Sequence, residues 1–397
     1  YPGNVANCAG TSNPINTSTC APPPAPPSNC GALTAADDTD LGFPCYCEGT
    51  SPNVVLMSCT TDHQAVALKK LDLRSLGITE VRAVNGAYPH FAGFSSVKEL
   101  YMQSNGLTAI PATLLAGLTV LDYLTMHSNA IAEWPATLFA DLASVTSINM
   151  YNNPVSGVPA TLFANTPLLE SLTLYWQGNP RTQVADVPAT LFANTTSLKL
   201  LRLSGTNLTT LPESLFSGLT SFTNRLDLTN NEFNILPAGL FSGLSQLAVV
   251  ELGENNFADP LALPSTLLAG MTSLTELGLS GNDLPSLPAG FLSDQQTLTV
   301  LDLRLNKLSA LPADLFVTQT GLNHLVLSNN EFTTVVFDQF ANLTNLIDLK
   351  LADNPWDCTS CDVLELSAFA PYVYTIENYY YPGNVANCAG TSNPINT

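Results

Sequence analysis

A unit of about 24 residues recurs along this chain between residues 97 and 354. Each copy opens with apolar residues at alternating positions and soon reaches an Asn, as in Leu100, Met102 and Asn105. The Asn recurs at Asn129, Asn153, Asn231, Asn255, Asn282, Asn306, Asn330 and Asn354. A single unit of this size cannot bury its own apolar face. The repeat therefore restricts the chain to an elongated stack of coils, in which each coil packs on its neighbours.

Each part of the unit predicts a local structure. The alternating apolar residues predict a short strand with one buried face, and successive units predict a parallel sheet. The Asn stands where the chain turns away from the sheet, so its amide can satisfy backbone groups that water cannot reach. A later apolar position predicts a buried row beneath the convex side, formed by Phe139, Phe163, Phe192, Phe216, Phe241, Phe316 and Phe340, with Leu115, Leu268 and Leu292 at the same position.

In one-letter code the unit approximates LxxLxLxxNxLxxLPxxLFxxLxx, and this pattern resembles the leucine-rich repeat. About eleven copies follow from Leu68, so residues 68–353 are assigned to the repeats. The resemblance implies a right-handed α/β solenoid shaped like a horseshoe. Its short parallel strands would line the concave face, and irregular or helical turns would form the convex face.

Two units depart from the pattern. The unit at residues 169–197 has Gln177 in place of the Asn and an insertion around residues 178–183, and the next unit has Thr206 in place of the Asn. These changes predict either a local bend of the solenoid or a loop that protrudes beside a binding face.

The two ends of the chain are identical: residues 1–17, YPGNVANCAGTSNPINT, recur as residues 381–397. Such ends are typical of a periodic polymer cut slightly longer than one period. They predict a tandem array or a head-to-tail assembly, in which the chain joins copies of itself through residues 1–20 and 381–397. The alternative is a recent short duplication. The Pro-rich residues 21–29 predict an extended, stiff spacer between modules.

Cysteines avoid the repeats and lie at Cys8, Cys20, Cys30, Cys45, Cys47, Cys59, Cys358, Cys361 and Cys388. This placement resembles the disulfide-bonded caps of extracellular leucine-rich repeat proteins. The N-terminal cap would be residues 30–67, and the C-terminal cap would be residues 354–397, overlapping the next unit. Residues 1–20 would then end the cap of the preceding unit. The resemblance implies the bonds Cys30–Cys47, Cys45–Cys59, Cys358–Cys388, and Cys361 with Cys20 of the next unit. A zinc or redox role for Cys358 and Cys361 is disfavoured, because cysteines grouped in caps indicate an oxidising compartment.

The charge and the sequons restrict the setting of the protein. With 32 acidic and 12 basic residues, the net charge of −20 argues against nucleic acid or an anionic membrane as partner. No apolar run is long enough to span a bilayer. We expect a secreted glycoprotein, with N-glycans on the N-x-S/T motifs at Asn16, Asn194, Asn207 and Asn342.

The outward positions of the predicted strands define a candidate ligand surface. In the first units these are Lys70, Asp72, Arg74, Glu99, Tyr101, Gln103, Tyr123, Thr125, His127, Asn149, Tyr151 and Tyr175. The four tyrosines and His127 would suit contact with a protein or a carbohydrate, because they offer flat apolar area together with polar groups. The alternative is that Tyr is simply a good strand residue that packs across the sheet. Further along, the charged residues Arg202, Arg225, Asp227, Glu251, Asp302, Arg304, Asp348 and Lys350 predict surface ion pairs.

Catalysis is not expected from this sequence. The four His residues are scattered over distant units, and no catalytic triad, metal-ligand spacing or phosphate-binding loop is present. We therefore predict no enzyme, no cofactor and no metal site. The leading hypothesis is a secreted structural protein that forms an extracellular filament, sheath or surface appendage. The alternative is a recognition or adhesion module that binds protein or glycan through its Tyr-bearing concave face.

Overall fold

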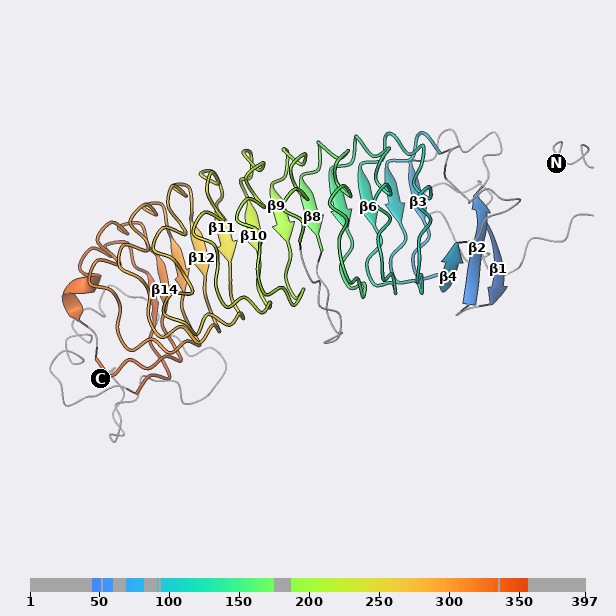
Figure 1. The fold of residues 1–397 in the computed structure, drawn as a ribbon. Coiled ribbons are helices and arrows are strands. Elements are labelled where there is room, and N and C mark those ends of the chain that lie inside the picture. Colours follow the sequence, from blue (N-terminus) through green and yellow to red (C-terminus); the bar gives the residue numbers. More distant parts are fainter. Residues whose placement is uncertain are drawn as a thin grey trace, which may run out of the picture.

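The computed structural model describes residues 45–50, 53–59, 69–81, 91, 94–174, 187–334 and 336–355. Most of them form a solenoid whose coils follow one another in a curved row (Figure 1). Each coil contributes one strand to a 12-stranded parallel sheet, in which every strand pairs with the strand of the next coil. The strands are β3 (Lys70–Asp72), β5 (Glu99–Tyr101), β6 (Tyr123–Thr125), β7 (Ser147–Asn149), β8 (Ser171–Thr173), β9 (Leu200–Arg202), β10 (Arg225–Asp227), β11 (Val249–Glu251), β12 (Glu276–Gly278), β13 (Val300–Asp302), β14 (His324–Val326) and β15 (Asp348–Lys350). This is the solenoid that the repeat predicts.

A second, smaller sheet stands at the N-terminal end of the row. It contains β1 (Cys45–Thr50), β2 (Asn53–Cys59) and β4 (Ile78–Val81). β1 and β2 pair antiparallel with Cys45 opposite Cys59, and β2 pairs in parallel with β4. Since β4 belongs to the first coil, the hairpin is attached to the end of the solenoid (Figure 1).

The strands are short and in register. The middle residue of each strand points into the core, as Leu226 does beside Leu201 and Val250 in the neighbouring strands. The long unit does not interrupt the sheet, because β8 pairs directly with β9 and places Ser171 opposite Leu200. Gln177 and the insertion itself lie outside the described residues.

The recurring Asn forms a ladder of buried hydrogen bonds that joins each coil to the previous one. At Asn306, Nδ2 donates to the carbonyl oxygen of Leu303 in its own coil (2.9 Å) and to that of Leu279 in the preceding coil (3.0 Å). Its Oδ1 accepts from the backbone N–H groups of Asn282 and Leu284, both at 3.1 Å. With a longer bond from Nδ2 to the carbonyl oxygen of Arg304 (3.3 Å), one amide therefore satisfies five backbone groups of two coils, as the sequence predicted.

Thr206 replaces the Asn in one coil and forms hydrogen bonds with fewer backbone groups. Its hydroxyl donates to the carbonyl oxygen of Leu203 at 3.1 Å and contacts Asn231 Oδ1 at 2.6 Å. A hydroxyl has one proton where the Asn amide nitrogen has two, so it cannot donate to its own coil and to a neighbouring coil at once. The ladder continues on the far side, because Asn231 Nδ2 donates back to the carbonyl oxygen of Leu203 at 2.9 Å.

The predicted row of Phe side chains lies at the back of the core. The rings of Phe163 and Phe192 stack at a centroid distance of 6.3 Å, as do those of Phe192 and Phe216. All of the predicted Phe and Leu positions of this row are buried. The convex segments outside the core are successive turns, together with one 3-10 helix, η3 (Phe337–Phe340), in the described part of the chain. The predicted convex face is thus built mainly from turns.

The residue before the ladder Asn adopts a left-handed backbone in coil after coil. Small or polar residues such as Gly205, Asn230 and Gly281 mostly occupy this position. Leu305 is the exception, with φ 57° and a side chain that is 55% exposed. A branched side chain in this conformation strains the backbone, and its exposure to water returns no hydrophobic stabilisation.

Replacing the ladder amide should destabilise the solenoid. We expect Asn306→Ala to lower the free energy of unfolding by about 3 kcal/mol, because buried backbone groups of two coils lose their partners. Urea unfolding followed by circular dichroism measures the change. The matched control is Asn345→Ala, which removes an exposed bond from Nδ2 to the carbonyl oxygen of Thr320 and should cost about 0.5 kcal/mol or less. Equal losses in the two variants would contradict the role of the ladder.

The strained leucine gives a prediction of the opposite sign. Leu305→Asn should raise the free energy of unfolding by about 0.5–1 kcal/mol, because Asn tolerates the left-handed region better than Leu. The reverse change at the equivalent exposed position, Asn230→Leu, should lower it by a similar amount. Thermal unfolding of both variants tests this pair, and a destabilised Leu305→Asn protein would refute it.

Candidate functional site

Two aromatic side chains meet on the concave face where neighbouring strands lie side by side. Tyr101 is the last residue of β5, and Tyr123 is the first residue of β6. Parallel pairing sets Tyr101 opposite Thr125, so the two tyrosines are diagonal neighbours. Their ring centroids are 5.4 Å apart, with an interplanar angle of 40°. Both residues are partly exposed, so they present apolar ring area and hydroxyl groups to a partner.

A second aromatic pair follows on the next positions of the same face. His127 lies two residues beyond β6, and Tyr151 lies two residues beyond β7. Their rings stack at a centroid distance of 4.2 Å and an angle of 13°. Burial lowers the pKa of His127, so the imidazole of this stack is neutral at neutral pH. We call the four side chains Tyr101, Tyr123, His127 and Tyr151 the aromatic face.

Positive charge borders the aromatic face at its N-terminal edge. Lys70 Nζ lies 4.5 Å from the centroid of the Tyr101 ring, and Arg74 Cζ lies 5.3 Å from it. These are cation–π distances. Arg74 also forms an ion pair with Asp72, with 2.7 Å between Nη2 and Oδ2.

The Tyr101 hydroxyl is held by its own strand. It donates a hydrogen bond to Glu99 Oε2 at 3.0 Å. Burial, and then the hydrogen bond and charge of Glu99, raise the pKa of Tyr101 to about 12. This ring is therefore a neutral phenol at any physiological pH.

Gln103 and Thr125 differ from the sequence prediction. Both stand at outward positions of the sheet, but Gln103 is 9% exposed and Thr125 is 1% exposed. Thr125 pairs with Tyr101 and stands between Tyr123 on its own strand and His127 just beyond that strand, so the large neighbouring side chains bury it. Gln103 Oε1 and Thr125 Oγ1 are buried without a hydrogen-bond partner. They are not part of the exposed surface, contrary to our expectation.

The other predicted surface residues are distributed as follows. Tyr175 lies outside the described residues. Asn149 lies beside Thr125 on β7 and is partly exposed, like the rings. The aromatic face therefore contains four of the five predicted ligand-binding residues.

The concave face changes character toward the C-terminus, where charged residues pair with one another. Arg225 forms ion pairs with Glu251 (3.3 Å) and Glu276 (3.7 Å). Arg304 pairs with Asp302 at 3.2 Å, and Lys350 Nζ lies 3.5 Å from Asp348. These contacts confirm the prediction of surface ion pairs for Arg225, Arg304 and Lys350. For Arg202, no ion pair is found with another described residue.

Burial acts on two carboxylates of this charged region. It raises the pKa of Glu251 and of Asp302, because a carboxylate loses hydration when neighbouring side chains surround it. The Glu251 carboxylate occupies the space above Gly278, where a Cβ atom would collide with it. This part of the face thus carries ion-paired charged side chains, whereas the part nearer the N-terminus carries the rings.

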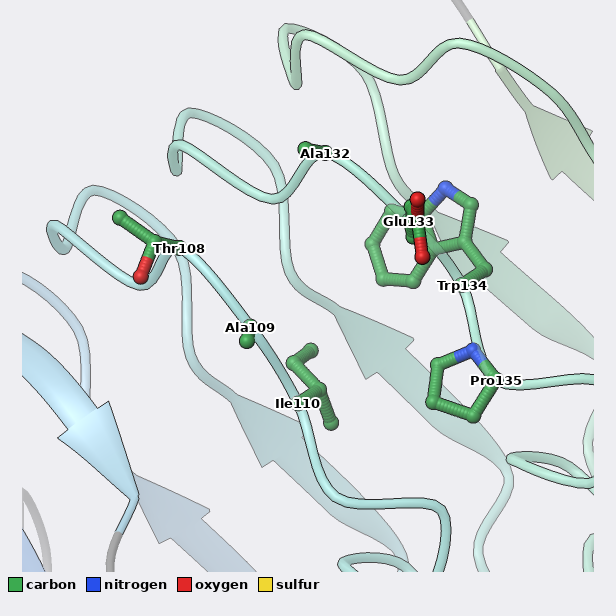
Figure 2. A pocket seen from close by; sticks show the side chains of 7 residues that line it. All are labelled: Thr108, Ala109, Ile110, Ala132, Glu133, Trp134 and Pro135. Atoms are coloured by element: carbon green, nitrogen blue, oxygen red, sulfur yellow. The ribbon is translucent and has the colours of Figure 1, made fainter.

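A pocket that sequence reasoning missed opens on a flank of the solenoid, between the coils of Ile110 and Trp134 (Figure 2). Its volume is about 280 Å³, and its lining consists of Thr108, Ala109, Ile110, Ala132, Glu133, Trp134 and Pro135. Trp134 stands before a Pro, where other coils carry Ile110, Val158 or Leu211. This unusual residue is the feature of the sequence that could have indicated the pocket. The lining is mainly apolar with one carboxylate, so the pocket offers contact area and no pair of groups for acid–base chemistry.

The candidate glycosylation sites differ in accessibility. Asn194 and Asn342 are exposed on the convex side, where their amides donate to backbone carbonyl groups of the preceding coil. Asn207 is partly buried and has a left-handed backbone with φ 53°. Asn16 lies outside the described residues.

The predicted disulfide bonds involve side chains that the structure does not describe. The side chains of Cys45, Cys47 and Cys59, and all of Cys20, Cys30, Cys358, Cys361 and Cys388, lie outside what the structure describes. Among the described residues, no group of three or more His, Cys, Asp or Glu side chains could hold a metal ion. None of the described segments forms a helix long and apolar enough to cross a membrane.

Comparison with sequence families places repeats over much of the chain. Residues 223–284 and 296–355 match the family described as leucine rich repeat. Residues 87–179 match the BspA type leucine rich repeat region. No curated protein matches the sequence.

Solved structures share the fold. A chain of the Drosophila Toll–Spatzle complex is 26% identical with a TM-score of 0.59, and the match covers 79% of this chain but 48% of that chain. A chain of the octameric complex of Latrophilin 3, Unc5D and FLRT2 is 22% identical with a TM-score of 0.62, covering 75% and 86%. A leucine-rich repeat protein of Leptospira interrogans is 23% identical with a TM-score of 0.58, covering 75% of each chain.

The present chain thus spans about half the length of the Toll-complex chain it resembles. The recurring unit, the parallel solenoid with its Asn ladder, and these matches all point to one family. The chain is a leucine-rich repeat protein.

Proposed function

We propose that this protein is a secreted recognition module that binds a protein or carbohydrate ligand through the aromatic face. The observation that carries the proposal is the grouping of four partly exposed aromatic side chains in two contacting pairs on adjacent strands. Aromatic side chains supply much of the binding energy of many interfaces, because they bury large area at a small entropy cost.

The scaffold supports this role. The four rings stand on or directly after strands of a continuous sheet, so their positions depend on the ladder and on core packing instead of on a flexible loop. A partner would therefore meet a surface that is already arranged for binding, which lowers the entropy lost on association.

The related structures favour recognition over a purely structural role. The Drosophila chain that this protein resembles was solved in a complex of Toll with Spatzle, so a solenoid of this kind holds a partner in that system. The same resemblance is the basis for proposing a secreted location here, with glycans at Asn194, Asn207 and Asn342. We infer binding rather than catalysis, because the partly exposed rings form a contact surface of apolar area and polar groups.

A second candidate is the extracellular filament, which is supported by one observation, the identity of residues 1–17 with residues 381–397. Both segments lie outside the described residues. In this proposal, a disulfide bond between Cys361 and Cys20 of the next unit joins the units. Such joining is compatible with ligand binding.

The joining proposal has a direct test. On a non-reducing gel, the secreted protein should run as a ladder of multimers, which should collapse to a single band when dithiothreitol is added. A single monomer band without reductant would refute disulfide-linked units.

Removing the rings tests the recognition proposal. Tyr101→Ala, Tyr123→Ala and Tyr151→Ala combined should weaken binding to a panel of extracellular proteins and glycans at least 100-fold, with little change in thermal stability. The stability should hold because the rings are partly exposed and lie outside the core. Surface plasmon resonance against each ligand that binds the wild-type protein measures the loss.

A matched control lies at the other end of the same sheet. Val300→Ala, His324→Ala and Val326→Ala combined also remove three outward side chains from adjacent strands, β13 and β14. This variant should keep wild-type affinity. Equal affinity of the tyrosine variant and the wild-type protein would exclude the aromatic face as the binding site.

A further inference from the structure

Two polar atoms beneath the aromatic face have no partner, which is unusual for a buried position. Gln103 Oε1 and Thr125 Oγ1 are inaccessible to water and accept or donate no hydrogen bond. A buried polar group without a partner destabilises a protein, because it loses its hydration and gains no hydrogen bond in return. Such groups are rare in folded proteins, and each one needs a physical reason.

Equivalent positions elsewhere in the sheet do not share this defect. Thr173, two coils further along at the position of Thr125, is partly exposed and can be hydrated. Thr229 stands in the row of Gln103 and His127, and its hydroxyl donates to Asp227 Oδ1 at 2.7 Å. On the concave face, the two unpartnered atoms therefore occur where the aromatic side chains gather. A third such atom among the described residues, Trp134 Nε1, belongs to a residue that lines the flank pocket.

Partly exposed side chains surround Thr125 on the concave face. Thr125 is flanked by Tyr101 and Asn149 on the adjacent strands, by Tyr123 on its own strand, and by His127 two residues beyond that strand. Rings at a protein surface change rotamer on a fast timescale, so a ligand that displaces one of them can reach the buried atoms. The aromatic face thus combines flat apolar surface with hydrogen-bonding groups directly beneath it.

The two atoms restrict the chemistry of such a ligand. The Gln103 side-chain oxygen can only accept a hydrogen bond, and the Thr125 hydroxyl can both donate and accept. A carboxylate or a phosphate dianion has no proton to donate to Gln103. A hydroxyl group can complement either atom, because it can donate to Gln103 Oε1 and can donate to or accept from Thr125 Oγ1.

We propose that the ligand of the aromatic face is a saccharide, whose hydroxyl groups pair with Gln103 Oε1 and Thr125 Oγ1 while the apolar face of its ring packs on the Tyr and His rings. This inference rests on the proposed function and narrows it from protein or carbohydrate to carbohydrate. A sugar ring presents C–H groups on one face and hydroxyl groups at its edge, which matches aromatic side chains beside buried polar atoms.

Thr125→Val separates this role from a structural one. Valine has the shape of threonine without the hydroxyl, so the variant removes a buried group that has no partner. The thermal midpoint should stay the same or rise, whereas loss of a satisfied hydroxyl would lower it. An array of neutral and acidic saccharides identifies those that the wild-type protein binds. The affinity of the Thr125→Val protein for these saccharides should be at least tenfold lower. The matched control is Thr173→Val, which should keep wild-type binding.

Two results would overturn the saccharide inference. One is a Thr125→Val protein that melts several degrees lower, because the hydroxyl would then have a partner in the native protein. The other is an array on which the wild-type protein binds no saccharide, or on which the Thr125→Val protein binds as well as the wild-type protein. Tyrosine-dependent binding to an extracellular protein in the absence of saccharide binding would leave the proposed recognition function intact. If the combined tyrosine variant bound both the saccharide and the extracellular protein as well as the wild-type protein does, the saccharide inference and the proposed recognition function would both be refuted.

Discussion

The structure depends on one constraint: a coil of about 24 residues has a buried turn whose backbone groups water cannot reach. The ladder amide meets this constraint by bonding to its own coil and to the coil before it, as Asn306 does with Leu303 and Leu279. The bonds join coils that cannot bury an apolar face alone. Sheet pairing and the stacked row of Phe side chains also join neighbouring coils, so each coil holds its neighbour in register.

Because the solenoid is regular, equivalent positions of different coils can be compared directly. Several outward positions of the C-terminal strands carry charged side chains that form ion pairs, as Arg225 does with Glu251 and Glu276. Near the N-terminus the same positions carry Tyr and His rings over polar atoms that have no partner. An arrangement that is unfavourable for the protein alone is the kind that ligand binding explains, because the free energy missing from folding becomes available on association.

The sequence predicted the periodic features of the fold because each follows from a pattern of residue types. The strand positions, the ladder amides and the row that contains Phe163 and Phe192 all lie where the repeat places them. The burial of Thr125 could not be predicted this way. An outward position is exposed only if its neighbours are small, and the cover over Thr125 comes from rings on two strands. Trp134 and Leu305 were missed for a related reason, since a repeat pattern describes the average coil and not the coil that departs from it.

The central claim is that ligand binding occurs on the aromatic face of a rigid solenoid. Hydrogen–deuterium exchange with and without a ligand that binds the wild-type protein tests it most directly. The account predicts added protection confined to β5, β6 and β7 and to the turns that follow them, which carry Tyr101, His127 and Tyr151. Added protection confined to the convex turns, or to the flank that contains Ile110 and Trp134, would contradict it.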